Sequence, residues 1–243
     1  MAKLICLQAG HEGTTTGATG APGEQEFTVR IRNRLSQILI SKGFQVQLVN
    51  ANPPASDINK DYSLFLAIHY DANIYGTGGG FVDFPEPSTD AATIESQRIA
   101  KDITSEYFKN SGIVDYPERS NGNTRYYYMW SRLSAKTPCV IIECGVGQDA
   151  HDKVILTDTD RVCNAIARGI CKAFNVPFDA VVPPPPSVDY KAKYEALQGE
   201  FKALEARFRD YKTSTDLEIS NKATIILQLT ERIKDIKEHT AKA

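Results

Sequence analysis

Two of the four histidines in this chain lie at the ends of apolar runs that are typical of buried strands. His11 follows the first run closely, and His69 ends another. A third apolar run, Val140 to Ile142, is followed directly by Glu143. In an open α/β sheet, the carboxyl ends of parallel strands meet in one crevice, so residues distant in sequence can lie together there. The pattern therefore predicts a metal site that contains His11 and His69 and needs one more ligand.

A carboxylate is the expected third ligand. A catalytic zinc site usually takes three protein ligands and leaves one position open, and two histidines with one glutamate are a recurring set. Glu24 and Glu26 both lie where a helical pattern begins. Glu24 shares its helical stripe with apolar residues and Glu26 with polar ones, so helix geometry selects Glu24. The two stripes are Phe27, Ile31, Leu35 and Ile38 for Glu24, and Arg30, Asn33 and Gln37 for Glu26.

Glu143 is the candidate catalytic residue. Alternation along a strand places Cys139, Ile141 and Glu143 on one face of the predicted sheet. A carboxylate that ends a buried strand could act as a general acid or base beside a metal, where burial raises its pKa toward the working pH. The alternative is a carboxylate held by backbone N–H groups or by an arginine such as Arg119. The convergence of all four positions on one sheet favours the catalytic interpretation.

The elements that would position these residues alternate along the first 180 residues. Apolar, β-branched runs typical of strands lie between helical periodicities, and this alternation predicts an α/β domain with a mostly parallel sheet flanked by helices. The expected strands are 4–7, 46–49, 64–68, 81–84 and 140–142, and the expected helices are 24–42, 90–109 and 158–174.

A proline run divides the chain into two compositions. We expect a catalytic domain over 1–180, a Pro-rich linker over 181–188 and a helical, coiled-coil-like segment over 189–243. Apolar residues in the last segment recur at alternating steps of four and three, which is typical of a coiled-coil seam and predicts a homo-oligomer. Around Thr215 the spacing requires either a stutter or a turn between two helices. The seam residues are Tyr190, Tyr194, Leu197, Phe201, Leu204, Phe208, Tyr211, Ile219, Ile226, Leu229, Ile233 and Ile236.

Composition narrows the class of protein. The formal net charge is −2, which does not suggest nucleic acid as a partner. No apolar run approaches the roughly 18 to 20 residues of a membrane span, and the first residues lack a signal-peptide pattern, so we expect a cytoplasmic protein. The five cysteines lack paired spacing and are expected to be buried thiols.

Residues 3–176 resemble the type 3 class of zinc-dependent N-acetylmuramoyl-L-alanine amidases, which includes bacterial autolysins and bacteriophage endolysins. Carried over by position, the zinc ligands of the family fall on His11, Glu24 and His69, and its catalytic glutamate falls on Glu143. The matching segments are AGHEG (9–13) with the TGATG run after it, EQEFTVRI (24–31), AIHYDAN (67–73), SQRIAK (96–101) and PCVIIECG (138–145).

The resemblance implies a zinc hydrolase that cleaves the amide between N-acetylmuramic acid and L-alanine in peptidoglycan. This chain differs from the family pattern at Gln8 and Glu12: the family usually has Asp-Pro-Gly-His-Gly over these five positions (8–12). It also has Tyr70 where a small residue is expected. Gln8 and Glu12 are expected to affect the surroundings of His11. The aromatic run from Tyr126 to Trp130 either packs on the sheet or stacks against glycan or peptide.

The setting that the resemblance favours is a phage endolysin that stays in the host cytoplasm until its release to the cell wall. A bacterial autolysin is the alternative setting. Two other functions remain open: a zinc peptidase that cuts within the stem peptide, and an inactive structural or assembly protein.

Overall fold

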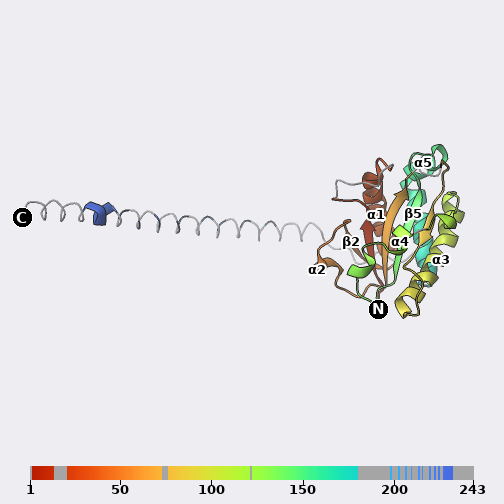
Figure 1. Ribbon diagram of the computed structural model, residues 1–243, viewed down its shortest axis with the longest axis horizontal. Coiled ribbons are helices and arrows are strands. Elements are labelled where there is room, and N and C mark those ends of the chain that lie inside the picture. Colours follow the sequence, from red (N-terminus) through yellow and green to blue (C-terminus); the bar gives the residue numbers. More distant parts are fainter. Residues whose placement is uncertain are drawn as a thin grey trace, which may run out of the picture. The chain divides into compact units, whose positions relative to one another are not determined.

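In the computed structural model, the N-terminal part of the protein is built on one five-stranded sheet in the order β2-β1-β3-β5-β4. Figure 1 shows this part, with β2 and β5 of the sheet labelled. Neighbouring strands run parallel except β4, which pairs antiparallel with β5 at the edge. This confirms the predicted mostly parallel sheet. The strands are β1 (Leu4–Ala9), β2 (Gln45–Val49), β3 (Leu64–Asp71), β4 (Phe81–Asp83) and β5 (Cys139–Val146).

The structure describes residues 2–13, 21–72, 76–120 and 122–179, together with residues 198, 202, 206, 209, 213, 215, 219, 222, 224 and 227–231. The chain divides into two compact units, Met1–Pro185 and Pro186–Ala243. No helix within the described ranges is both long enough and apolar enough to cross a membrane.

Three long helices pack on one face of the sheet. They are α1 (Glu24–Ser41), α3 (Ala91–Ser111) and α6 (Thr159–Ala173), and their ends agree with the predicted ranges to within two residues. Each helix buries an apolar stripe in the main core cluster, which gives it the tertiary packing that helices need in water. Asp90 caps α3 by accepting a hydrogen bond from Thr93 N at 2.8 Å.

The other face of the sheet carries a smaller core and the functional residues. Cys6, Phe65, Ala67 and Ile141 point to this face from three neighbouring strands. It is covered by short elements: α2 (Ala55–Ile58), the 3-10 turn η2 (Trp130–Arg132) and the segment between η2 and β5. The other short elements are η1 (Pro117–Arg119), α4 (Gly122–Arg125) and α5 (Ala150–Thr157).

All five cysteines are buried and free, as the sequence predicts. Burial raises the pKa of Cys6 and Cys139 to about 12, so neither thiol is a thiolate at neutral pH. The five cysteines belong to the two core clusters.

The described positions of the C-terminal segment are helical, including Thr213 and Thr215 beside the expected stutter. Thr213 donates a hydrogen bond to Arg209 O at 2.9 Å, as a threonine inside a helix can. Two seam residues, Ile219 and Leu229, are described and exposed; the other ten seam residues and the linker 181–188 lie outside the described residues.

Candidate metal centre and active site

His69 and Glu143 lie side by side at the carboxyl ends of β3 and β5. The two residues are direct register partners, so their side chains point to the same face of the sheet. That face is the one with the smaller core, because Ala67 and Ile141, two residues earlier on each strand, belong to it. The register shifts between His69 and Asp71, an irregularity of the kind often found beside active sites.

His11 enters the same site from the turn after β1. Its backbone φ is 60°, a left-handed conformation that is uncommon for a residue other than glycine. The preceding glycine is required by packing, since a Cβ at Gly10 would lie 2.4 Å from Cε1 of His69. Thr28 of α1 donates a 2.6 Å hydrogen bond to Gly10 O and holds this turn in place. The two imidazole rings meet edge to face with centroids 5.2 Å apart.

Glu24 is the first residue of α1 and is almost completely buried. Gly23 precedes it with a φ of 86°, and this left-handed turn directs the first helical residue inward. Tyr70 supports the turn because its hydroxyl donates to Pro22 O and its ring packs on Phe27. The unexpected tyrosine at position 70 is therefore a structural support for the helix start.

Glu24 lies between the two histidines. Its Oε1 is 2.9 Å from Nδ1 of His69, and its Oε2 is 3.4 Å from Nε2 of His11. One ligand atom from each of the three residues lies within 4.8 Å of the others. The buried Oε2 of Glu24 has no hydrogen-bond partner among the described residues. Two imidazoles and a carboxylate with an unsatisfied buried oxygen fit a zinc ion. Glu26, the rejected candidate, is exposed.

Glu143 carries a perturbed carboxyl group. Its Oε2 is buried and has no hydrogen-bond partner in the described part of the chain. Burial raises the pKa of Glu143 well above its usual range, and the nearby charges of Glu24 and Asp71 raise it further. A raised pKa makes a carboxyl group easier to protonate, which suits a group that must accept a proton and then deliver it.

Arg119, which the sequence suggested as an alternative partner for Glu143, binds the loop before β4. It donates hydrogen bonds to the carbonyls of Thr77, Gly78 and Gly79 at 3.0 to 3.1 Å and lies 4.0 Å from Asp71. The buried arginine therefore holds the loop that leads into β4. Burial raises the pKa of Asp71, and Arg119 opposes this effect.

A second group of possible ligands, Asp149, His151 and Asp152, has a structural explanation. Asp149 caps α5 by accepting hydrogen bonds from the backbone N–H groups of His151 and Asp152. Asp152 is buried and accepts hydrogen bonds from Gly79 N at 2.5 Å and Val146 N at 2.9 Å. Both carboxylates thus bind backbone groups, and Asp152 ties the loop before β4 to the end of β5.

The two departures near His11, Gln8 and Glu12, both have partners among the described residues. Glu12 pairs with Arg32, whose Nη2 lies 3.2 Å from Glu12 Oε1, so its charge is compensated. Gln8 is fully buried and contacts Tyr127, which in turn contacts His69 Nε2 at 3.2 Å. Gln8 is therefore linked to the site through Tyr127, which contacts His69. No sequence pattern links Gln8 to Tyr127, because they are 119 residues apart.

The aromatic run that ends at Trp130 is divided between core and surface. Trp130 packs on Phe65 and Tyr127 with ring centroids 6.3 and 5.2 Å away, which confirms the packing interpretation for this residue. Tyr126 is 70% exposed. Burial raises the pKa of Tyr127 well above its usual range, so its hydroxyl keeps its proton.

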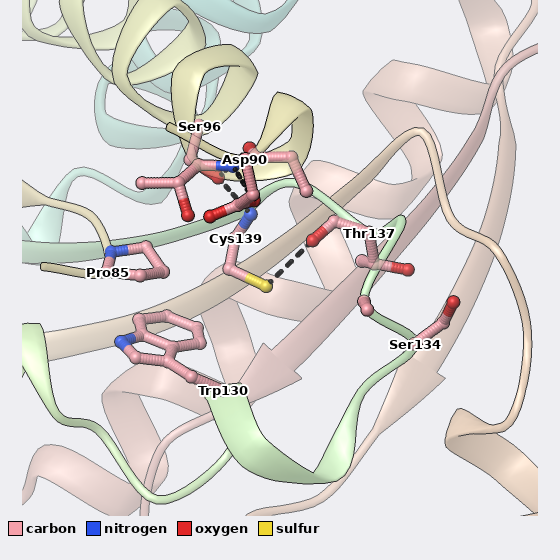
Figure 2. Close-up of a pocket in the computed structure, with 10 residues that line it drawn as sticks. Pro85, Asp90, Ser96, Trp130, Ser134, Thr137 and Cys139 are labelled. Carbon is pink, nitrogen blue, oxygen red and sulfur yellow. Dashed lines mark hydrogen bonds between the residues drawn. The ribbon is translucent and has the colours of Figure 1, made fainter. Parts of the chain in front are cut away.

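Two hollows lie beside Trp130. Figure 2 shows the one at the amino end of β5, a cavity of about 260 Å³ lined by Pro85, Ser96, Trp130 and Cys139, among others. In it, Cys139 N donates to Ser96 Oγ at 2.8 Å. The other hollow, of about 380 Å³, shares Pro85, Asp90, Thr93 and Trp130 with it and extends to Tyr127. The metal ligands line neither hollow, but Tyr127 connects the second one to His69.

Comparison with known proteins identifies the same fold and family. Residues 5–174 match the family model described as N-acetylmuramoyl-L-alanine amidase. A curated relative, an endolysin of Bacillus phage SPP1, is 25% identical over 183 residues, which cover 70% of this chain. The match spans 64% of the length of that endolysin.

Solved structures share the fold at low sequence identity. The amidase Ami1 from Mycobacterium smegmatis superposes with a TM-score of 0.57 at 20% identity, over 71% of this chain and 97% of that one. An N-acetylmuramoyl-L-alanine amidase from Clostridium difficile 630 gives the same TM-score at 16% identity, over 72% and 97% of the two chains.

Proposed function

The chain belongs to the N-acetylmuramoyl-L-alanine amidase family, and we propose that it is a zinc hydrolase that cleaves the amide between N-acetylmuramic acid and L-alanine in peptidoglycan. The observation that carries this proposal is the meeting of His11, Glu24 and His69 beside Glu143, from four separate elements of the fold. This arrangement provides both a ligand set and a proton carrier.

His11, Glu24 and His69 would hold the zinc ion. Zinc bound by such a set polarises the carbonyl of the scissile amide and lowers the pKa of a water molecule. Glu143 would accept a proton on its carboxylate from the attacking water and deliver it to the nitrogen of the departing amine. Its place beside His69 on the same face of the sheet supports this role.

The protein surroundings keep the carboxyl group of Glu143 suited to this exchange. Its buried position and the neighbouring carboxylates Glu24 and Asp71 all disfavour a permanent negative charge. Arg119 and Asp152 hold the adjoining loop through backbone contacts. These residues therefore position the wall of the site.

The biological setting that we propose is that of a phage endolysin, held in the host cytoplasm until it reaches the cell wall. The similarity to the endolysin of Bacillus phage SPP1 supports this setting. A bacterial autolysin remains the alternative setting for the same chemistry.

A lysis assay tests the proposal. Purified protein should contain about one zinc per chain and clear a suspension of bacterial cell walls. Removal of the metal with a chelator should abolish clearing, and zinc should restore it. Full lytic activity in protein without bound metal would refute the zinc mechanism, and no lysis in zinc-loaded protein would favour a structural role.

A further inference from the structure

We propose that Gln8 and Tyr127 form a positioning relay that fixes the tautomer of His69 and directs its Nδ1 lone pair toward Glu24. The relay consists of three side chains in sequence: Gln8 contacts Tyr127, and Tyr127 contacts His69. The inference rests on the proposed function, because a fixed tautomer matters here if His69 ligates a metal.

The orientation of the Gln8 amide is set by the backbone. Its Nε2 donates hydrogen bonds to Ala51 O at 3.1 Å and Asn50 O at 3.3 Å. Carbonyl oxygens only accept, so the opposite orientation would place Gln8 Oε1 against two acceptors. Gln8 is fully buried, and bulk water cannot replace these partners. The Oε1 atom must therefore face Tyr127.

The hydroxyl of Tyr127 has one proton to give. Its oxygen lies 2.9 Å from Gln8 Oε1 and 3.2 Å from His69 Nε2. If the proton pointed to His69, two acceptor oxygens would face each other at 2.9 Å in a buried place, which is unfavourable. The proton therefore goes to Gln8, and the Tyr127 oxygen accepts a hydrogen bond from an N–H at Nε2 of His69.

The consequence appears at the other ring nitrogen. A neutral imidazole protonated at Nε2 has its lone pair at Nδ1. That lone pair faces Glu24 Oε1 at 2.9 Å. Without a cation these two buried acceptors would repel each other, so the relay applies to the protein in which Nδ1 and the carboxylate both hold a zinc ion. Ring packing keeps the relay in place, since Tyr127 meets His69 and Trp130 edge to face at 5.5 and 5.2 Å.

Gln8 is suited to this relay in a way that aspartate is not. N-acetylmuramoyl-L-alanine amidases of this family usually have aspartate at this position, and a carboxylate could not donate hydrogen bonds to the carbonyls of Asn50 and Ala51. The amide both anchors itself and accepts from Tyr127. The relay is therefore a property of this sequence.

Zinc affinity, measured by competition with a chelating dye, tests the relay through a double-mutant cycle. Tyr127→Phe keeps the ring and should weaken zinc binding by about 10- to 100-fold, the usual effect of removing an outer hydrogen-bond partner. Gln8→Met should weaken it as well, but should have little additional effect in the Tyr127→Phe background. Tyr126→Phe, a change on an exposed neighbouring ring, is the control and should bind zinc normally. Additive losses, or a Tyr127→Phe affinity within twofold of the wild type, would overturn the relay.

A second measurement does not depend on the variants folding well. Nitrogen NMR of the zinc-loaded wild-type protein shows directly which nitrogen of His69 binds the metal and which carries the proton. We expect a slowly exchanging proton on Nε2 in the wild type, and faster exchange of that proton with solvent in Tyr127→Phe. A wild-type proton on Nδ1 would contradict the relay. A correct tautomer in a zinc-binding protein that releases no peptide from peptidoglycan would leave the relay intact and refute the proposed amidase function.

Discussion

Glu24 and Glu26 differ in burial, and their positions on the helix decide this difference. They are two residues apart at the start of α1, yet Glu24 is buried between His11 and His69 whereas Glu26 is exposed. Charge and residue type are the same, so a matched pair of substitutions isolates the effect of position.

Glu24→Gln should reduce zinc affinity by more than the roughly 10- to 100-fold that loss of an outer partner costs. The amide has the size of the carboxylate but lacks its negative charge. Glu26→Gln should bind zinc like the wild type. Metal content and chelator competition on the two purified variants check this; loss of zinc from the Glu26 variant alone would show that the wrong glutamate has been chosen.

Glu143→Gln should keep the fold and the zinc content but lose activity by a factor on the order of 100 to 10,000, the range for loss of a general acid or base. The amide cannot carry the proton from water to the departing amine. Kinetics of wall hydrolysis and metal analysis on the same preparation check both parts. Near-normal turnover in the variant would remove Glu143 from the mechanism.

The raised pKa of Glu143 also predicts a pH-dependent gain in stability in Glu143→Gln after metal removal. The ordinary pKa of a glutamate, about 4.3, describes the unfolded chain, and burial raises it in the folded state. Below that pH the carboxyl is protonated in both states and the variant should gain little. As the pH rises toward the folded-state pKa, the wild type should lose stability relative to the variant. Thermal melts across this range would contradict the account if the gain shrank with rising pH.

The four candidate positions could be predicted because each ends a strand or begins a helix with a clear periodicity. The structure brings His11, Glu24 and His69 together and places Glu143 beside His69. The relay through Gln8 and Tyr127 could not be predicted, since Tyr127 lies in an irregular segment whose path is set by tertiary packing.

At the scale of elements, the backbone of the turn after β1 packs closely against the ring of His69. An added Cβ at Gly10 would overlap the His69 ring, whereas space around Gly43 is open. Gly10→Ala should therefore weaken zinc binding as well as the fold. Gly43→Ala, at a φ of 88°, should lose stability through backbone strain and keep its zinc affinity. Zinc titrations and thermal melts of the two variants check this, and normal zinc affinity in Gly10→Ala would show that the ring can move aside.

The long helices could be predicted because each repeats its apolar residues toward the core, and the strands because they are apolar, β-branched runs. The short elements between α3 and β5 could not. That connection is held by particular contacts, such as Arg119 on the carbonyls of residues 77–79 and Asp83 with Ser120 and Thr124. Such contacts leave no repeating pattern in the sequence.

At the scale of the whole molecule, we propose that the C-terminal segment associates chains through its apolar seam. Ile219 and Leu229 of the seam are 61% and 52% exposed in the single chain. Association would raise the effective concentration of each catalytic unit at an insoluble wall. Light scattering should give an oligomeric mass for the intact chain and a monomeric mass for a chain that ends near residue 180. A monomeric intact chain would refute the association.

The identity of the bond that is cut tests the central claim most directly. Purified peptidoglycan should be digested with the protein, with and without a chelator, and the products identified by mass. We predict intact stem peptides that begin with L-alanine, together with glycan strands that have lost their peptides, and neither product in the presence of chelator. Peptides cut within the stem, with N-acetylmuramic acid still joined to L-alanine, would contradict the account.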